Sequence, residues 1–358
     1  MPRRITLRDI ATAAEVDIST VSRALRNSPS VRSDTRALIQ KAASDLGYIP
    51  DPAMSALVAY RKGVRTSSYQ STIAWLDNWR VRGELRKIEA FDEYFVGAAE
   101  RAARFGYKLD EFPLRSKGLT PGRLGAILRA RNIRGIIVAP QQHDGEKLGF
   151  DFADFSAVAL GYSLRPASLH VVTNHQFLSA TLAMSRLRAL GYRRIGLYLY
   201  ADWDLKVNEG YSSGFLSAQK HVAKKNRIAP FLHDVPESAP ENIISDAFRA
   251  WVGRARPDAI ISQGLSDKLG DWLKPLGLRV PRDIGIADLS TPSDKPDVTG
   301  IYQNNRRIGA TAVDLVVGMI QRNERGLPDT LLYTLVDGIW RPGKTVRTIV
   351  SDPARAPI

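Results

Sequence analysis

Short apolar runs alternate with longer amphipathic stretches along most of this chain, from Thr72 onward. The short runs are typical of buried strands, and the stretches between them repeat apolar residues at helical spacing. Such alternation predicts parallel sheets that are covered by helices on both faces. Because about 280 residues exceed what one sheet organises comfortably, we expect two α/β lobes. The predicted strands are 73–76, 134–138, 157–160, 195–199, 258–261 and 284–287, and the clearest helices are 94–105, 177–190 and 243–252.

The composition narrows the classes of protein to which the chain can belong. With 358 residues, 44% of them hydrophobic, it can form two or three compact units. It has no cysteine, which excludes disulfides and thiolate chemistry. The first residues lack the apolar stretch of a signal peptide, and no apolar run reaches the length of a membrane span. We therefore expect a cytoplasmic protein without a membrane partner.

The formal net charge of +14 favours polyanionic partners, through screening and counterion release. Nucleic acids and acidic membrane surfaces both attract this charge, so the charge by itself does not choose between them. Its place beside a recognisable helix pattern is more informative.

Three helices are predicted before residue 47. Thr6 can cap the first, and Asp9 completes a capping-box spacing. Asp17 is the expected N-cap of the second helix, 18–26, and the short bridge before it predicts a helix–turn–helix. The third helix begins at Ser33 or Asp34, and its expected buried stripe is Ala37, Leu38, Ala42 and Leu46.

The second helix carries polar side chains on the side away from Val21 and Leu25. Short hydroxyl groups can donate to phosphates, and an arginine can fork onto a guanine edge in the major groove. A small solvated helical bundle with no partner is the alternative interpretation. The polar residues are Ser19, Thr20, Ser22 and Arg23.

Ordered strings of residues make the first fifty positions more specific. They are Ile5-Thr6-Leu7-Arg8-Asp9-Ile10-Ala11 and Val16-Asp17-Ile18-Ser19-Thr20-Val21-Ser22-Arg23-Ala24-Leu25, followed by Leu46-Gly47-Tyr48-Ile49-Pro50. Together they resemble the DNA-reading head of the LacI family, the lactose-repressor type of bacterial transcription regulator. The resemblance implies base contacts by Ile18, Ser19 and Arg23, and phosphate contacts by Thr20, Ser22 and Thr35. Arg26 departs from the asparagine common at its position, so its role stays open between a phosphate contact and a solvated surface.

A hinge segment is expected after the head. Asp51 and Pro52 can start a short helix. The resemblance implies that this helix folds on operator DNA and that Leu57 wedges into the minor groove, where it would kink the duplex. Ser55 and Ala56 replace the long polar residue that often precedes this leucine, which leaves minor-groove polar contacts open. An ordinary linker helix with Leu57 packed between subunits is the alternative.

The remaining chain resembles the type I periplasmic-binding-protein fold, which serves as the sensor in the same family. The resemblance rests on short fragments in the expected order, at 133–137, 190–196, 214–215, 280–286, 303 and 308–309. It implies three crossings between lobes, which we place near Pro166, Thr291 and Pro328. The predicted domains are a head at 1–50, a hinge and linker at 51–69, and an effector-binding domain at 70–350. Lobe 1 would comprise 70–166 and 291–328, and lobe 2 would comprise 167–290 and 329–350.

Ligands of open α/β lobes bind beyond the carboxyl ends of the strands. Residues just after the predicted strands offer aromatic faces, amides and carboxylates, which suit a sugar. Packing in the core or at an interface is the alternative role for the aromatic residues among them. The predicted effector-binding residues are Asp77, Trp79, Gln141, Trp203, Tyr211, Gln263 and Tyr302.

Several positions depart from the ligand residues that are usual in the family. Tyr211 stands where an arginine commonly grips a sugar, and Gly264-Leu265 replaces an Asn-Asp pair. Residues 174–176 replace an expected Asp-Asn pair. The resemblance therefore implies the fold and a cleft between lobes, but not the identity of the ligand.

The expected function is a sequence-specific DNA-binding transcription regulator, of the repressor type, controlled by a carbohydrate or a related small molecule. One head buries too little surface for high specificity, so we expect a homodimer on a pseudo-palindromic operator. The five histidines lack metal-ligand spacing, and no phosphate-binding loop or nucleophile elbow is present, so neither an enzyme nor a cofactor or metal is expected. The alternatives are a ligand-independent architectural DNA-binding protein and a solute-binding receptor.

Overall fold

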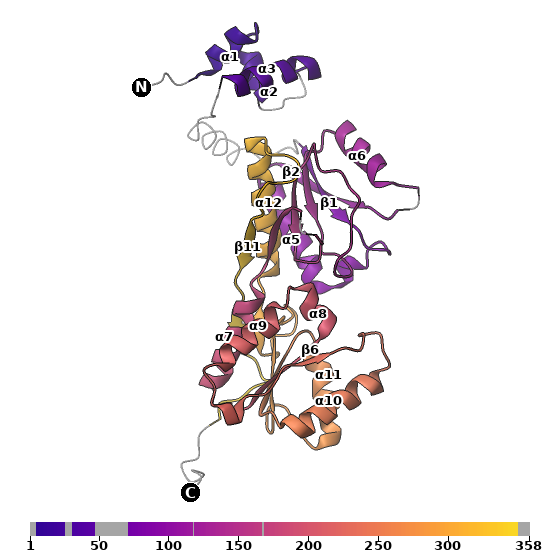
Figure 1. The fold of residues 1–358 in the computed structure, drawn as a ribbon, viewed down its shortest axis with the longest axis vertical. Helices are drawn as coiled ribbons and strands as arrows, with labels where there is room; N and C mark the ends of the chain where they lie inside the picture. The colour runs from indigo at the N-terminus through magenta and orange to yellow at the C-terminus, as the bar shows by residue number, and fades with distance from the viewer. Residues whose placement is uncertain (1–4, 26–30, 47–70, 117, 167, 350–358) are drawn as a thin grey trace. The chain divides into compact units, whose positions relative to one another are not determined.

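The computed structural model describes residues 5–25, 31–46, 71–116, 118–166 and 168–349. The chain divides into two compact units, Met1–Ser68 and Tyr69–Ile358 (Figure 1). This division lies next to the predicted junction at 69–70. The predicted hinge helix, with Leu57, lies outside the described residues, as does Arg26.

The first unit contains three helices, α1 (Leu7–Ala13), α2 (Ile18–Leu25) and α3 (Ser33–Asp45). At the start of α1, the Thr6 amide donates to the Asp9 carboxylate at 2.7 Å, as the predicted capping box requires. One fully buried residue from each helix forms the centre of the core, Ile10, Val21 and Ile39. The all-α helix–turn–helix head is therefore confirmed.

The predicted buried stripe of α3 is wrong at its first two positions. Ala37 is exposed and the Leu38 side chain is 53% exposed, whereas Ile39 and Ala43 are buried and Leu46 packs against them. Ile39, Ala43 and Leu46 follow one another at intervals of four and three residues, which keeps them on one face of a helix. Ile39, and not Leu38, therefore lies on the face of α3 that packs into the core.

The second unit contains two six-stranded sheets. All neighbouring strands of the first sheet are parallel. Its strands, in spatial order, are β11 (Tyr333–Val336), β5 (His170–Asn174), β4 (Ser156–Leu160), β3 (Gly135–Val138), β1 (Ser71–Asp77) and β2 (Tyr107–Pro113). We call this sheet with its helices lobe 1.

The second sheet, which with its helices forms lobe 2, is also mainly parallel. Only β12 is antiparallel to its neighbour β10 among the strands described. The strand order is β12 (Ile339–Arg341), β10 (Gly300–Tyr302), β9 (Gly285–Asp288), β8 (Ala259–Ser262), β6 (Ile195–Tyr200) and β7 (Phe231–His233). All six predicted strands are present in these two sheets.

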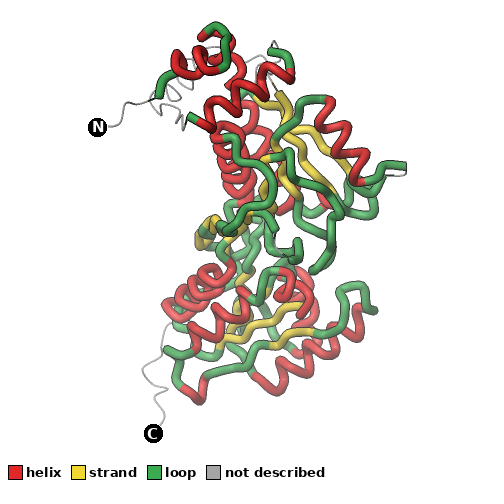
Figure 2. The backbone as a smooth tube through the Cα atoms, turned by 45° about the horizontal axis from the view of Figure 1, so that its top comes forward, coloured by secondary structure: helices red, strands yellow, loops and turns green. Residues whose placement is uncertain are grey.

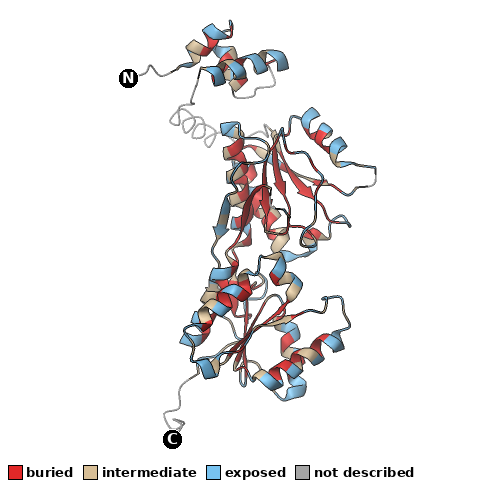
Figure 3. Cartoon of the chain, viewed as in Figure 1, coloured by how far each residue is buried: buried red, intermediate tan, exposed pale blue. Residues whose placement is uncertain are grey.

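Helices cover both faces of each sheet, as the continuous apolar runs predict (Figure 2). In lobe 1, α5 (Glu89–Arg104) and α12 (Asn305–Arg322) share one apolar cluster and α6 (Pro121–Ala130) lies in the other. In lobe 2, α7 (Gln176–Ala189) and α9 (Gly210–Gln219) cover one face, and α10 (Glu241–Ala255) and α11 (Ser266–Leu273) the other. The buried residues concentrate on the strands and on the helix sides that face them (Figure 3). The two-lobed α/β architecture is confirmed.

Four short helices complete the described elements. Three are 3-10 helices, η1 (Leu85–Lys87), η2 (Lys224–Asn226) and η3 (Lys274–Leu276). The fourth, α8 (Ala201–Lys206), follows β6 directly. None of the helices in the described ranges is long and apolar enough to cross a membrane.

The chain crosses between lobes later than predicted. Strand β5 belongs to lobe 1 and β10 to lobe 2, and the last crossing falls between β11 and β12. The crossings thus follow Asn174, Tyr302 and Val336, which corrects the positions near Pro166, Thr291 and Pro328. After each predicted position comes one more strand that is short or polar. Because β5, β10 and β11 lack a long apolar run, the sequence pattern does not predict them as strands. The turn residues before each of them therefore resemble the crossing itself.

Candidate functional site

Helix α2 presents one face to solvent and the other to the core of the head. Val21 and Ala24 are buried, whereas Ser19 and Arg23 are exposed and Ile18 is 38% exposed. The three residues predicted to contact bases therefore share the open side of the helix. This is the arrangement that a recognition helix needs to reach base edges in a major groove.

Local hydrogen bonds fix the start of α2. The Ser19 amide donates to the Asp17 carboxylate at 2.7 Å, so Asp17 is the N-cap of α2, as predicted. The hydrogen bonds from Ser19 lower the pKa of Asp17 below its ordinary value. The Arg23 guanidinium donates to the Ser19 carbonyl oxygen at 3.1 Å and to Ser19 Oγ at 3.0 Å. Ser19 and Arg23 are thus held together on the exposed face.

The three predicted phosphate-contact residues lie at the margins of this face. Thr20 and Ser22 are half-buried on α2, and Thr35 is half-buried in the first turns of α3. Partly covered hydroxyl groups of this kind can donate to a backbone phosphate without reaching the bases.

In lobe 1, three of the predicted effector residues come together at the carboxyl ends of β1 and β3. The Trp79 amide donates to Asp77 Oδ1 at 2.8 Å, and the Trp79 indole donates to the Pro140 carbonyl oxygen at 2.8 Å. Asn78, between them, donates to Gln141 Oε1 at 2.8 Å. Burial raises the pKa of Asp77. The end of β1 is therefore held against the end of β3 by polar contacts.

The predicted residues of lobe 2 do not form one group. The Trp203 ring lies 5.0 Å from the Tyr200 ring, close to Gly264. Gln263 follows the last residue of β8 and is half-buried. Tyr302 lies under the Arg341 guanidinium, which is 4.4 Å from the ring centroid.

Tyr211 belongs to a polar network at the first two crossings. Its hydroxyl oxygen accepts a hydrogen bond from Gln303 Nε2 at 2.5 Å. Gln303 also accepts from the Asn174 amide, and Gln176 donates to Asn174 Oδ1 at 2.6 Å. All of these side chains are buried. Asn174 and Tyr211, at two of the positions that differ from the family pattern, therefore both contact Gln303.

Sequence reasoning missed Lys206, which links the two lobes. From the end of α8 in lobe 2, its ammonium donates to the Gln142 carbonyl oxygen of lobe 1 at 3.0 Å. It also lies 5.8 Å from the Trp79 ring centroid and 5.7 Å from that of Phe91. Burial lowers the pKa of Lys206 to about 8. Its position shortly after a strand was a signal, but its partners are more than sixty residues away in the sequence.

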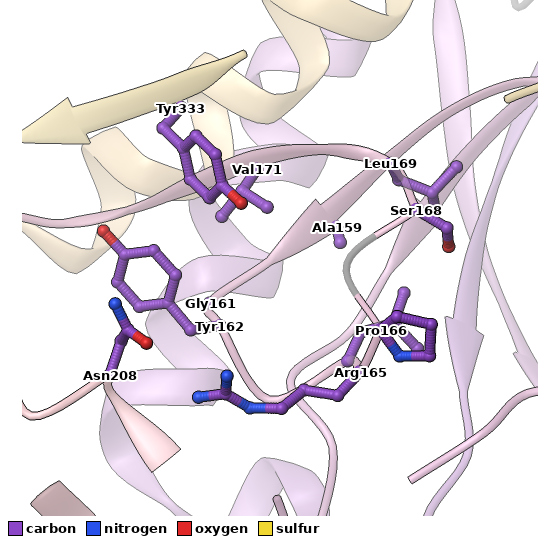
Figure 4. Close-up of a pocket in the computed structure, with 11 residues that line it drawn as sticks. Ala159, Gly161, Tyr162, Arg165, Pro166, Ser168, Leu169, Val171, Asn208 and Tyr333 are labelled. Atoms are coloured by element: carbon purple, nitrogen blue, oxygen red, sulfur yellow. The ribbon is translucent and has the colours of Figure 1, made fainter. Parts of the chain in front are cut away.

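A cavity of about 160 Å³ lies in lobe 1, beside the loop that follows β4. Tyr162 and Tyr333 face each other across one side, with 5.9 Å between ring centroids (Figure 4). Arg165 and, from lobe 2, Asn208 also line it. None of the seven predicted effector residues lines this cavity, so their role as one binding site stays a prediction.

Among the described residues, no group of three or more His, Cys, Asp or Glu side chains is placed to hold a metal ion.

Two family models match separate parts of this chain. Residues 6–51 match the model described as bacterial regulatory proteins, lacI family. Residues 184–338 match the periplasmic binding protein-like domain. The matches fall on the head and on the second unit, so the predicted resemblance is confirmed in both parts.

Curated relatives align with nearly the whole chain. The HTH-type transcriptional regulator CelR of Thermobifida fusca is 25% identical, over 89% of this chain and 92% of its own. The HTH-type transcriptional repressor PurR of Haemophilus influenzae is 23% identical, over 93% and 95%. The HTH-type transcriptional regulator GntR of Escherichia coli is 29% identical, over 92% and 96%. Each of these alignments therefore spans both units of the chain.

Solved structures share the fold. A complex of the transcriptional regulator CelR with cellobiose has a TM-score of 0.54 and 19% identity, covering 96% of this chain and 100% of that one. A lac repressor dimer bound to operator and the anti-inducer ONPF has a TM-score of 0.55 and 18% identity, with the same coverage.

Proposed function

Because the chain belongs to the LacI family of bacterial regulatory proteins, we propose that it is a transcriptional repressor whose affinity for operator DNA is set by a small carbohydrate or carbohydrate derivative. The observation that carries this proposal is the helix–turn–helix head, with Ile18, Ser19 and Arg23 on the exposed face of α2. It acts in the cytoplasm, on the nucleoid, and without catalysis.

On DNA, α2 enters the major groove and its exposed residues contact base edges. Thr20, Ser22 and Thr35 donate to flanking phosphates. Leu57 wedges into the minor groove. A homodimer places two heads on a pseudo-palindromic operator, since one head offers too small an interface for high specificity.

The effector binds between the lobes, where the carboxyl ends of the strands of each sheet provide polar and aromatic groups. Asp77, Trp79 and Gln141 serve from lobe 1; Trp203, Tyr211, Gln263 and Tyr302 serve from lobe 2 and the second crossing. Binding changes the angle between lobes and so the spacing of the two heads, which couples the ligand to the operator. The CelR–cellobiose complex supports a carbohydrate as the class of ligand.

Replacing Arg23 by alanine is expected to reduce the discrimination between operator and random DNA by roughly 1–3 kcal/mol, about 5- to 150-fold. The reason is that the guanidinium can donate two hydrogen bonds to one guanine, and alanine can donate none. The operator is first selected from a random duplex library with the wild-type protein, and both affinities are then measured at one salt concentration.

Arg23→Lys is the matched variant, because it keeps the charge but cannot fork. It should lose discrimination nearly as much as Arg23→Ala while retaining more affinity for random DNA. Equal losses on operator and random DNA in both variants would assign Arg23 to a phosphate. Failure of the library to yield any preferred sequence would contradict sequence-specific regulation and favour an architectural DNA-binding protein.

A further inference from the structure

Lys206 is a half-buried cation, and the described residues offer it few hydrogen-bonding partners. An ammonium group has three N–H donors, but within the part of the chain that the structure describes Lys206 has one hydrogen-bond acceptor, the Gln142 carbonyl oxygen. Its other close neighbours are the faces of Trp79 and Phe91, which attract a cation but accept no strong hydrogen bond. Lys206 therefore has unused donor capacity at the contact between the lobes.

The carboxylates near Lys206 already have arginine partners. Glu146 pairs with Arg115 at 2.7 Å, and Asp144 pairs with Arg165 at 2.7 Å. Two carboxylates and two guanidinium groups cancel, so the Lys206 ammonium leaves this group of five residues with an excess of one positive charge.

An excess charge at a desolvated position is costly unless an opposite charge joins it. Two opposing effects act on the pKa of Lys206: desolvation lowers it, and the attraction of Glu146 and Asp144 raises it. Desolvation is the larger effect, so the pKa is lowered. An anion that approached from the space between the lobes would supply the missing charge and the missing acceptors. The anion would also attract the Arg165 guanidinium. The Nη2 of Arg165 already donates to the Leu205 carbonyl oxygen of lobe 2 at 3.2 Å.

We propose that Lys206 binds the anionic group of the effector, so that the ligand of this protein is an acidic sugar derivative, a carboxylate or a phosphate, rather than a neutral sugar. This inference rests on the proposed function, since it assigns the chemistry of the same effector. The anion takes the place of the Gln142 carbonyl oxygen as the main partner of Lys206, while Trp79 and Phe91 keep water from the pair. Lys206 thereby makes closure of the lobes depend on the charge of the ligand.

The test measures binding to the full-length protein by calorimetry and thermal shift. The probes are glucose, galactose and mannose, each compared with its uronate and its 6-phosphate, which separates carboxylates from phosphates. We expect the wild-type protein to prefer one acidic form over its neutral parent by about tenfold or more. Raising the pH from 7 to 9 should reduce this preference by about tenfold, because Lys206 loses its proton on passing pH 8.

Lys206→Met keeps a long apolar side chain over Trp79 and Phe91 but removes the charge. It should abolish both the preference for the acid and its pH dependence. Lys220→Met, at an exposed position that ends α9, removes one charge from the same lobe and should preserve both.

The outcomes separate this inference from the proposed function. Binding of a neutral sugar with no preference for its acidic forms would overturn the role of Lys206 and leave control by a sugar standing. A Lys206→Met protein that melts at lower temperature but keeps the acid preference would also overturn it, since Lys206 would then only hold the lobes together. If no probe of either kind binds, both this inference and control by a sugar are contradicted.

Discussion

Replacing Asp288 by alanine is expected to lower the free energy of unfolding of lobe 2 by about 3 kcal/mol or more. Asp288 is the last residue of β9 and is almost fully buried. Its Oδ1 accepts from the Gly264 amide at 2.9 Å and from the Ser290 amide at 2.8 Å, and its Oδ2 accepts from Ser266 Oγ at 2.5 Å. Alanine would remove the acceptor of three hydrogen bonds at a partly buried site, and each such bond contributes about 1 kcal/mol.

Urea denaturation followed by tryptophan fluorescence measures this loss, since Trp203, Trp251 and Trp272 all lie in lobe 2. Asp271→Ala is the matched control in the same lobe. Asp271 is exposed and, among the residues that the structure describes, its ion pair is with Lys274, so its removal should change stability by less than about 0.5 kcal/mol. If Asp288→Ala were as stable as this control, the carboxylate would not be what organises the start of α11.

Replacing Gly309 by alanine is expected to destabilise lobe 1 by about 3 kcal/mol, through a clash between two backbones. Gly309 lies on α12 where this helix meets α5. A Cβ built on Gly309 would lie 1.8 Å from the Tyr94 carbonyl oxygen, and one on Gly97 would lie 2.0 Å from the Arg306 carbonyl oxygen. Because backbone cannot move aside as a flexible side chain can, the helices must separate.

Differential scanning calorimetry should show a melting temperature lower by roughly 6–12 °C. Gly253→Ala is the control, since Gly253 is also inside a helix, on α10, but a Cβ there meets no atom within 4 Å. That control should be neutral or stabilising by up to about 1 kcal/mol, as helix propensity dictates. A Gly309→Ala protein that melts with the control would show that α5 and α12 can separate at little cost.

The parts of the fold that the sequence predicts are those in which local pattern and burial coincide. Strands β3, β4, β8 and β9 consist of buried residues throughout, and each appears in the sequence as an apolar run. Strand β11 alternates exposed and half-buried residues at the edge of its sheet, and β5 contains His170, Thr173 and Asn174. These two strands are defined by their neighbours in the sheet, so sequence pattern alone does not reveal them.

The candidate sites follow the same division. The exposed face of α2 is a local property of eight residues, and the sequence predicts it well. Lys206 and the Gln303 network depend on contacts between segments that are more than sixty residues apart, such as Gln303 with Tyr211. In α3, Leu38 and Ile39 are equally apolar neighbours, and only the packing of three helices decides which one is buried.

The last crossing has a consequence for how the protein is made. Strand β11 completes the sheet of lobe 1 and β12 that of lobe 2, and only Asp337 and Gly338 separate them. During synthesis, the edge strands of both sheets are therefore translated at nearly the same time. Most of lobe 1 has left the ribosome long before this point. A nascent chain that has passed residue 322 carries every helix that the structure describes in the two lobes, but one edge strand is still missing from each sheet. Because unpaired sheet edges can pair with other chains, we expect this stage to need protection by a chaperone most.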